Sequence, residues 1–540
     1  MKRTHFSREL PFVVAGFSLL TIVLTYPQIR FMSSRAGDHY DVLFSVWRLA
    51  WIAHQLPRDP LHLFDGNIFF PQPHTLAYSD ALLLPGVLGA PLMWAGLSPV
   101  LVHNVLVLFS FAACGVAMYL LCRELTGSPV AACVGGIVFA FQPYRFAHYS
   151  QLELLWGWPI PLAFLAAHRI VTLGRVRDGV WLGVILAVQV FCCLYYAVFL
   201  VTALVVLLAA LLLGRRREEI LSVIRPGLAA CAVAALLAVP YLLQYLAIGM
   251  TRSKGELEQW SGTLASYLSV LPQNWLYGHA MGFRGSPIEG VMFPGIAAVV
   301  LAMIGLTGSL ERRRVAYLAL MLVAFDMSLG SHGWLYGTMY RTMWVYRGLR
   351  VPARMFVIVS AVLSVLAADG VRRGMALVNA PWLRRGAGAA LIAIVLLESA
   401  TVPVHLTRVP HLASTYTWLE AQPRAVVMEW PMPKPSSLGL THEPFYMYAS
   451  TVHWQPLVNG YSGFYPLSYI HFLENTEGFP SAAAVEYLRA ASVRYVLLHS
   501  QFDRSAYVDT RVALNGRSDI ELVSEEQGPD ELALYRIGPK

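Results

Sequence analysis

Long apolar stretches recur through the first 400 residues of this 540-residue chain, and they restrict its fold more than any other feature. The chain is 56% hydrophobic and only 13% charged, whereas soluble globular proteins are about 45–50% apolar and about 25% charged. A segment of about 20 apolar residues can cross a hydrocarbon core of about 30 Å as a helix. The sequence therefore predicts an α-helical polytopic membrane protein. It excludes a disordered chain, a collagen-like fibre and a secreted disulfide scaffold.

The apolar segments also give an expected number of spans. The candidates are residues 11–29, 80–97, 99–122, 129–143, 152–168, 179–193, 195–213, 227–249, 291–308, 315–329, 354–370 and 387–402. The stretch 179–213 would be about 52 Å long as one helix, so we expect a break near Cys192–Tyr196. Segment 80–97 contains Pro85, Pro91 and three glycines, a composition that suits a re-entrant or interfacial element.

Arginine clusters between the spans set the expected orientation. The clusters are Arg123 with Glu124, Arg169–Arg177, Arg215–Arg225, Arg312–Arg314 and Arg372–Arg385. Cytoplasmic loops carry the excess of Lys and Arg, and all five clusters share the side of the N-terminus if segment 80–97 does not cross. We therefore expect about eleven spans in a bacterial inner membrane, with the N-terminus inside and the C-terminus outside. Because orientation explains the net charge of +8, no nucleic-acid partner is expected.

The composition changes after residue 402, and 14 of the 32 acidic residues follow it. Alternating apolar runs predict strands at Val426–Trp430, Tyr495–His499 and Leu532–Ile537, and a helix near Ala482–Ala491. The expected organisation is a transmembrane domain at 1–402 and a small extracytoplasmic α/β domain at 403–540.

The first outer loop, residues 30–98, carries two acids that are three residues apart, Asp38 and Asp41, before an amphipathic stretch, Val42–Leu56. A helix here would place both carboxylates on one face and would lie at the membrane surface. Paired acids suit general-base catalysis or a divalent metal such as Mg²⁺ or Mn²⁺. The alternative is that Asp38 caps the helix and Asp41 pairs locally, and the spacing alone favours this alternative.

This layout resembles the GT-C superfamily of glycosyltransferases over roughly residues 1–400. The shared features are an acidic first outer loop, a surface helix, a proline-broken segment, many spans and an outer soluble domain. The resemblance implies transfer of a sugar from a polyprenyl-phosphate carrier, with Asp38 or Asp41 at the catalytic position. The loop lacks the adjacent Asp-Glu pair of protein O-mannosyltransferases, and the chain lacks the Trp-Trp-Asp triplet of oligosaccharyltransferases. A lipid-linked or polysaccharide acceptor is therefore favoured over a protein acceptor.

The resemblance also implies a second acid in the next outer loop, residues 142–153, where Glu153 is the candidate. Glu153 begins an apolar span, and an ionisable group there is costly unless it has a function. Local pairing of Glu153 with Arg145 or His148 is the equal alternative. Arg145 and His148 are themselves candidates for binding the donor.

Arginines also gather at Tyr340–Arg354, where the orientation rule predicts few. Arginine binds phosphate through a planar fork of donors. Arg350 and Arg354, with Arg347, are therefore the candidates for binding the donor phosphate. The alternative is that these arginines snorkel to lipid headgroups.

The expected function is a membrane glycosyltransferase that uses a polyprenyl-phosphate-linked sugar and a lipid or glycan acceptor, with membrane lipids around it. A divalent metal is the only cofactor considered. The alternative is a transporter or scaffold, which should carry ionisable groups deep in several spans; only Asp326 and Glu398 near span ends suggest this. Aromatic and polar residues in Glu443–Tyr469 suit either a sugar or a packed interface, and we favour the interface.

Overall fold

The computed structural model describes residues 3–37, 40–249, 251–282, 288–307, 311–433, 442–528 and 530–538. The chain forms two compact units. Unit 1 consists of Met1–Gly37 and Asn104–Leu406, and unit 2 consists of Asp38–His103 and Thr407–Lys540. The second crossing between units lies close to the boundary expected near residue 403. The compact unit that contains the tail, however, also contains the first outer loop.

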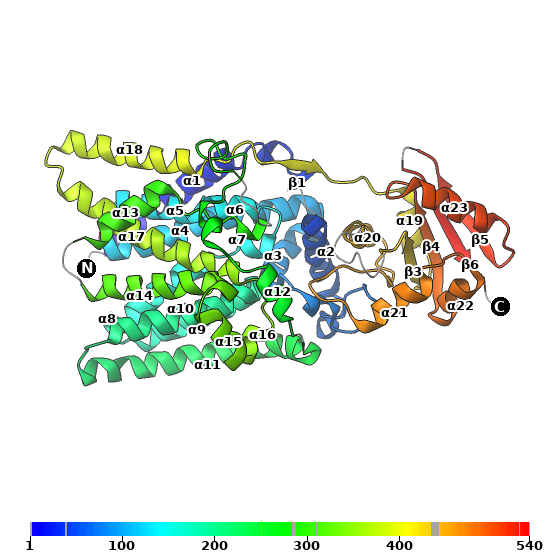
Figure 1. Cartoon of the computed structure of the whole chain (residues 1–540), viewed down its shortest axis with the longest axis horizontal. Helices are drawn as coiled ribbons and strands as arrows, with labels where there is room; N and C mark the ends of the chain where they lie inside the picture. Colours follow the sequence, from blue (N-terminus) through cyan, green and yellow to red (C-terminus); the bar gives the residue numbers. More distant parts are fainter. Residues whose placement is uncertain are drawn as a thin grey trace. The chain divides into compact units, whose positions relative to one another are not determined.

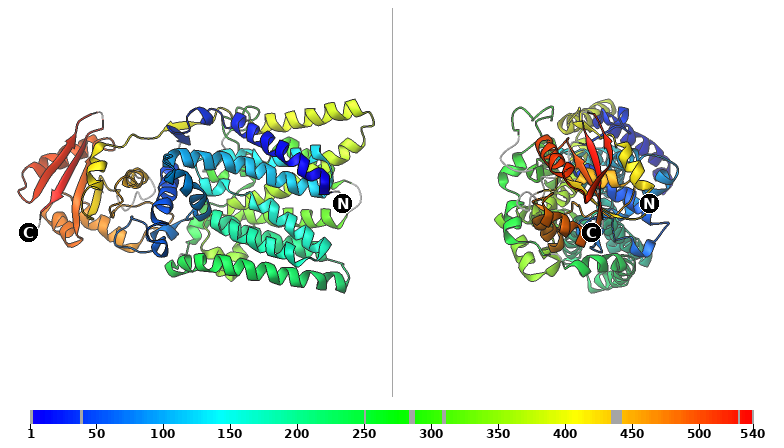
Figure 2. Two further views of the ribbon diagram at one scale, coloured as in Figure 1. Left: turned by 180° about the vertical axis from the view of Figure 1, so that it is seen from behind. Right: turned by 90° about the vertical axis from the view of Figure 1, so that its right-hand side faces the viewer.

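Unit 1 is a bundle of helices (Figure 1). Its helices are α1 (Arg3–Leu24), α4 (Pro99–Thr126), α5 (Pro129–Ala140), α6 (Pro143–Ala147), α7 (Leu152–Leu155), α8 (Pro159–Leu173), α9 (Val176–Cys192), α10 (Leu194–Leu212), α11 (Arg217–Ile248), α12 (Lys254–Gln259), α13 (Ile296–Leu306), α14 (Arg312–Ser328), α15 (Leu335–Thr342), α16 (Trp344–Arg347), α17 (Phe356–Ala376) and α18 (Pro381–Ser399). The first turn of α4 is part of unit 2. Figure 2 shows the long helices of the bundle from two further directions.

Six helical segments within the described residues are long and apolar enough to cross a membrane. They are Pro99–Thr126, Pro129–Ala147, Leu152–Leu173, Leu194–Leu212, Arg217–Ile248 and Pro352–Ala376. The expected count of about eleven is therefore not confirmed, partly because α9 and α14 have 17 residues each and α13 has 11. The expected break in 179–213 is confirmed, because α9 ends at Cys192 and α10 begins at Leu194.

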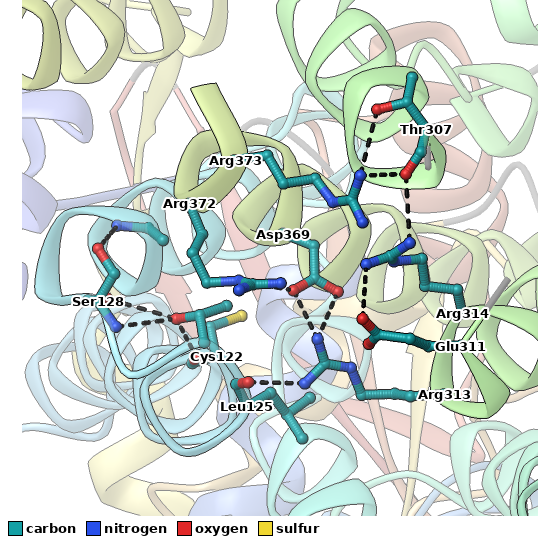
Figure 3. Close-up of polar contacts among 12 residues, drawn as sticks. Cys122, Leu125, Ser128, Thr307, Glu311, Arg313, Arg314, Asp369, Arg372 and Arg373 are labelled. Atoms are coloured by element: carbon teal, nitrogen blue, oxygen red, sulfur yellow. Dashed lines mark hydrogen bonds and ion pairs between the residues drawn. The ribbon is translucent and has the colours of Figure 1, made fainter. Parts of the chain in front are cut away.

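The predicted arginine clusters meet at one end of the bundle. Asp369, near the end of α17, accepts hydrogen bonds from Arg313 at 2.7 and 3.0 Å and pairs with Arg372 at 3.6 Å (Figure 3). Arg313 also donates to the carbonyl of Leu125 at the end of α4. The other clusters join through Arg123–Glu9, Arg169–Glu124 and Arg312–Gly214 contacts. We call this end of unit 1 the basic end.

Glycines allow several of these helices to pack closely. A Cβ at Gly370 on α17 would collide with the carbonyl oxygen of Leu301 on α13, and a Cβ at Gly305 on α13 would collide with the carbonyl of Leu366 on α17. A Cβ at Gly179 on α9 would likewise collide with the backbone of α11. Small residues at such positions let helix backbones approach, which is how apolar helices associate in lipid.

Unit 2 joins the first outer loop to an α/β sandwich. Its helices are α2 (Tyr40–Gln55), α3 (Leu83–Trp94), α19 (Ser414–Glu420), α20 (Glu443–Ser450), α21 (Leu467–Thr476), α22 (Ala482–Ala490) and α23 (Arg504–Asn515). Because α3 has 12 residues, it is about 18 Å long and too short to span a membrane. Helices α3 and α20 both pack against α2.

The sheet of unit 2 has the strand order β3-β4-β6-β5. Its strands are β3 (Val426–Trp430), β4 (Val493–His499), β5 (Ile520–Glu526) and β6 (Leu532–Ile537). Strands β3 and β4 are parallel, and the other neighbours are antiparallel. Side chains alternate between two cores, so that α21, α22 and α23 cover one face and α19 and α20 cover the other. The predicted strands at 426–430, 495–499 and 532–537 and the helix near 482–491 are confirmed.

Candidate functional site

A buried ion pair lies at the end of α17 that is remote from the basic end. Arg354, in the short 3-10 helix η7 (Pro352–Met355), donates from Nε to both carboxylate oxygens of Glu289, at 3.1 and 3.2 Å. Glu289 lies in η5 (Ile288–Gly290), and both side chains are 9% exposed. Glu289 is not among the residues predicted from the sequence, where its one signal is that it is a lone acid next to apolar residues, between the candidate spans 227–249 and 291–308.

His148 lies against the same carboxylate. Its Nε2 is 3.6 Å from Oε2 of Glu289, and its Nδ1 is 2.6 Å from the amide oxygen of Gln151. Burial lowers the pKa of His148 more than Glu289 raises it. Burial would raise the pKa of Glu289, but Arg354, His148 and Arg350 outweigh this and hold the pKa below its usual value. At neutral pH Glu289 is therefore ionised and His148 is uncharged.

Two further arginines extend this group. The backbone N–H of Arg350 donates a hydrogen bond of 3.0 Å to the hydroxyl of Tyr195. The guanidinium of Arg354 lies 4.8 Å from the centre of the same tyrosine ring. Arg252 is electrostatically coupled to both Arg350 and Arg354, and burial followed by Arg350 lowers its pKa. In the arginine group (Arg252, Arg350 and Arg354), the charges of Arg350 and Arg354 act on the carboxylate of Glu289, and Arg252 is coupled to these two arginines. Arg252 pairs with Glu256 at 3.5 Å.

The other predicted donor-binding residues lie in different surroundings. Arg347 is exposed at the end of α16 and donates to the carbonyls of Tyr340 and Arg341. Arg145 is buried in α6, donates to the carbonyl of Leu155 at 2.9 Å and lies over the ring of Phe111. These contacts hold Arg145 within the helix packing of unit 1, and its role in donor binding stays a prediction.

Glu153 is buried in α7, and it shares the surroundings of His148. It is 9% exposed, and its charge favours the protonated form of His148. Glu153, His148 and Glu289 therefore belong to one buried polar region of unit 1. The role of Glu153 as an assisting acid stays a prediction.

The acidic pair of the first outer loop belongs to unit 2. Asp38 lies outside the described residues. Asp41 is in the first turn of α2, is partly exposed, and its Oδ1 accepts a hydrogen bond of 3.0 Å from the hydroxyl of Tyr461. The role of Asp41 as a general base stays a prediction.

The predicted helix after Asp41 is present, but it is not half exposed as expected. Ser45 is fully buried, Arg48 is 1% exposed, and Arg48 donates to the carbonyl of Asp80 and to Ser45 Oγ. On the other side, Trp47 and Trp51 donate to Asn67 and to the carbonyl of Leu63. Both faces of α2 are therefore covered within unit 2. Its polar side chains hydrogen-bond to the rest of the first outer loop and do not form a face open to solvent.

Among the described residues, no group of three or more His, Cys, Asp or Glu side chains has the arrangement of a metal site. Asp38, one of the two predicted ligands, is not among them. The metal at Asp38 and Asp41 therefore stays a prediction.

Asp326 and Glu398, the two acids that favoured a transporter, each cap the start of a helix. Asp326 accepts from the backbone N–H groups of Trp334 and Leu335 at the start of α15, at 2.8 to 3.1 Å. Glu398 accepts from the Ala297 N–H at the start of α13 and from the hydroxyl of Tyr277. Carboxylates at helix N-termini stabilise the unpaired N–H groups and the helix dipole. A structural role thus accounts for both residues.

Comparison with protein families gives a match over most of the helical bundle. The family model described as "Domain of unknown function (DUF6311)" matches residues 50–397. The chain belongs to this family. No curated protein sequence matches the chain.

Solved structures resemble the chain over nearly its full length. The mycobacterial arabinofuranosyltransferase AftD matches with a TM-score of 0.68 at 15% identity and covers 99% of this chain, which spans 40% of AftD. The oligosaccharyltransferase of Archaeoglobus fulgidus has a TM-score of 0.51 at 15% identity, with 95% of this chain and 71% of that one covered. ArnT from Cupriavidus metallidurans has a TM-score of 0.51 at 13% identity, with 99% and 100% covered. The GT-C fold expected for this member of the DUF6311 family is confirmed.

Proposed function

We propose that this protein is a membrane glycosyltransferase that transfers a sugar from a polyprenyl-phosphate carrier to a lipid-linked or glycan acceptor at the outer face of the membrane. The arginine group is the observation that carries the proposal. Its three guanidinium groups and the two carboxylates that pair with them, Glu289 and Glu256, leave a positive charge in loops where the orientation rule predicts few arginines. A phosphate is the ligand that this charge and the planar donor forks of arginine fit.

Within this proposal the members of the arginine group have different tasks. Arg354 is neutralised and fixed by Glu289, and it lies against Tyr195. Arg350 is only partly buried, so its guanidinium is the one that we expect to contact the phosphate. Arg347, Arg145 and His148 are secondary candidates for donor binding.

Asp41 is the proposed general base, and Asp38 shares the position in the sequence. A carboxylate there takes the proton from the acceptor hydroxyl as the hydroxyl attacks the anomeric carbon, and the carrier phosphate leaves. The Tyr461 hydroxyl donates to Oδ1 of Asp41 and fixes the orientation of the carboxylate. The similarity of the fold to AftD supports this class of reaction; because the chain spans 40% of AftD, the activity of the whole AftD protein is not transferred to it.

The decisive experiment uses the purified full chain in lipid nanodiscs with a panel of polyprenyl-phosphate sugars and neutral oligosaccharide acceptors. Binding and consumption of the donor are measured for wild type, Arg350→Gln and Asp41→Asn. Arg350→Gln should weaken donor binding about ten- to a hundredfold, because it removes a charge-assisted contact. Asp41→Asn should lower kcat about a hundredfold or more while donor binding stays unchanged.

Arg341→Gln is the matched control, because Arg341 is an exposed arginine of the same segment and it is outside the arginine group. If Arg350→Gln and Arg341→Gln bind the donor equally well, the phosphate role of the group is wrong. If no carrier-linked sugar binds to wild type, the glycosyltransferase proposal is wrong. Transport of the intact donor across the bilayer without transfer would support the transporter instead.

A further inference from the structure

Unit 2 contains a cavity of about 620 Å³ that lies apart from Asp41. Its walls come from the end of α2, from the loop that follows it as far as Pro73, and from the segments 420–424 and 453–456. This volume is in the range of pockets that bind small molecules. All of these wall residues belong to unit 2, so the cavity is defined within one compact body.

Trp454 gives the cavity an aromatic wall in a strained conformation. Its φ is +53°, in the left-handed region that non-glycine residues with large side chains rarely adopt. His54 stacks on the Trp454 ring with 4.2 Å between ring centres, and Trp51 supports it at 5.7 Å. Backbone strain of this kind persists where the surrounding structure enforces it, and it concentrates at binding sites. The ring is only partly buried, as an aromatic platform for a ligand would be.

His453, next to Trp454, also contributes to the wall and carries a buried hydrogen-bond donor. It is 6% exposed, and its Nδ1 accepts from the backbone N–H of Gln455 at 3.0 Å. Because burial lowers the pKa of His453 to about 3, the ring is neutral and its proton must sit on Nε2. Within the described chain, this Nε2 has no hydrogen-bond partner. A buried donor without a partner costs free energy.

The charges of the cavity wall select against a phosphate. Asp59, Asp65 and Glu420 supply carboxylates, whereas Arg424 supplies the one guanidinium among the wall residues of the cavity. Carboxylates accept hydrogen bonds from hydroxyl groups and repel anions. The amide groups of Gln55 and Gln72 add donors and acceptors to the same wall.

We infer that this cavity binds a neutral oligosaccharide, whose sugar ring stacks on Trp454 and whose hydroxyls bond to the carboxylates and the amides of the wall. An aromatic platform with surrounding polar groups is the arrangement that a sugar ring fits, since its C–H face is apolar and its edge carries hydroxyls. The identity of this oligosaccharide as the acceptor rests on the proposed glycosyltransferase function. The binding itself does not.

The test measures binding of neutral oligosaccharides to the full chain in nanodiscs, without donor, by titration calorimetry and saturation-transfer NMR. The panel contains tetrasaccharides of pentofuranose and of hexose, a six-residue peptide and inorganic phosphate. Trp454→Asn is the main variant, because asparagine adopts left-handed backbone angles readily and the protein should fold without the ring. It should weaken oligosaccharide binding at least about tenfold.

Trp334→Ala is the matched control, because Trp334 is 86% exposed in unit 1. This variant should bind the oligosaccharides with the affinity of wild type. Glu420→Gln should weaken binding less than Trp454→Asn, since the amide keeps one acceptor. Absence of binding by any oligosaccharide overturns the inference, as does equal affinity of Trp454→Asn and wild type. Binding of the peptide in place of the oligosaccharides, lost in Trp454→Asn, would also overturn it.

The two proposals fail separately. Oligosaccharide binding that depends on Trp454, combined with no donor binding, would refute the glycosyltransferase and leave the glycan site. Sugar transfer that is unaffected by Trp454→Asn, combined with no binding of oligosaccharide at the cavity, would refute the glycan site and leave the enzyme.

Discussion

Burial of Glu289 and Arg354 removes both charges from water, and each is stable there only because of the other. The Glu289 carboxylate accepts two hydrogen bonds from Arg354 Nε. Removing one partner of a buried ion pair typically costs about 3–5 kcal/mol, because the remaining charge is left uncompensated. Each partner is therefore needed for stability as long as the other is present, whatever Arg354 contributes to binding.

We predict that Glu289→Gln lowers the stability of the protein in nanodiscs strongly, measured as the midpoint of thermal unfolding. The double variant Glu289→Gln, Arg354→Gln should recover much of this loss, since neither charge remains and the two amides can bond to each other. Donor affinity should not recover with it. A double variant as unstable as the sum of the two single variants would contradict this account.

Glu443 is a second buried carboxylate, in unit 2, and it faces neutral groups instead of an arginine. Its Oε1 accepts from Tyr469 at 2.9 Å and from Asn459 at 3.1 Å, and burial raises its pKa from 4.5 to about 8. The folded protein thus holds a proton that the unfolded chain releases above about pH 4.5. The stability that this proton contributes is present at low pH and is lost as the pH rises from about 4.5 through about 8.

We expect the unfolding temperature to decrease as the pH rises from 5 to 9. The decrease should be less steep in Glu443→Gln, because the amide keeps a hydrogen-bond acceptor but cannot ionise. Glu477→Gln is the control, since Glu477 is exposed in the same unit. Glu429 is also buried, with a pKa that burial raises although His499 opposes it, so some slope should remain. A Glu443→Gln variant with the slope of wild type would show that Glu443 does not carry the effect.

A residue of the site could be predicted from the sequence where its type is unexpected at its position in the topology. Arg350 and Arg354 were selected because arginines are unexpected on an outer face, and the structure places them near each other. Glu289 and Tyr195 were not selected, because their pairing with the arginines joins segments more than 60 residues apart. A single acid or tyrosine in a loop carries no signal of such a partner.

At the scale of elements, periodicity predicted the strands of unit 2 closely, and it failed where a helix is buried on all sides. Strands β3 and β6 match their predicted bounds, because alternating side chains enter two separate cores. For α2 the polar positions suggested an exposed face, yet Arg48 is buried by bonds within its own unit. Sequence periodicity cannot distinguish a polar face open to water from one satisfied by a neighbouring loop.

The contact between α13 and α17 gives a prediction for an element. Gly370→Ala should force the two helices apart, because its Cβ would collide with the Leu301 carbonyl oxygen, and backbone cannot move aside as a side chain can. Overpacking of this kind costs about 1–3 kcal/mol. Gly374→Ala on the same helix meets nothing within 4 Å and should be neutral or slightly stabilising. Thermal unfolding of the two variants side by side measures the difference, and equal midpoints would contradict the close packing of α13 on α17.

At the scale of the whole molecule, the layout of the sequence predicted the GT-C fold. The order of the segments along the chain did not indicate which of them form each compact unit. Residues 38–103 join residues 407–540 in unit 2 although more than 300 residues separate them. Contacts such as Asn67 with Ser450 and with the Gln455 carbonyl hold them together. Nothing in the composition of either segment indicates that pairing: one includes the apolar segment 80–97 and connects two apolar spans, and the other follows the last apolar span.

The directions of α1 and α18 within unit 1 give a prediction for the orientation in the membrane. Helix α1 reaches the basic end through Glu9, and the residues from Glu9 to the end of the helix at Leu24 carry the chain about 22 Å away from that end. Helix α18 likewise begins near the end of α17, where Arg384 donates to Met375, and ends at Glu398, which caps the start of α13. Within unit 1, both helices therefore run from the basic end to the opposite end.

Because arginines concentrate on the cytoplasmic side, unit 2 should be extracytoplasmic, and cysteine labelling in whole cells tests this. In a variant whose six cysteines are replaced, Val512→Cys on α23 and Leu377→Cys after α17 place a thiol at positions that are 68% and 83% exposed. A membrane-impermeant maleimide should label Val512→Cys in intact cells and Leu377→Cys only after the membrane is permeabilised. The reverse pattern would place the basic end outside, and an outer-leaflet donor could not then meet Asp41 and the acceptor on the side that we propose.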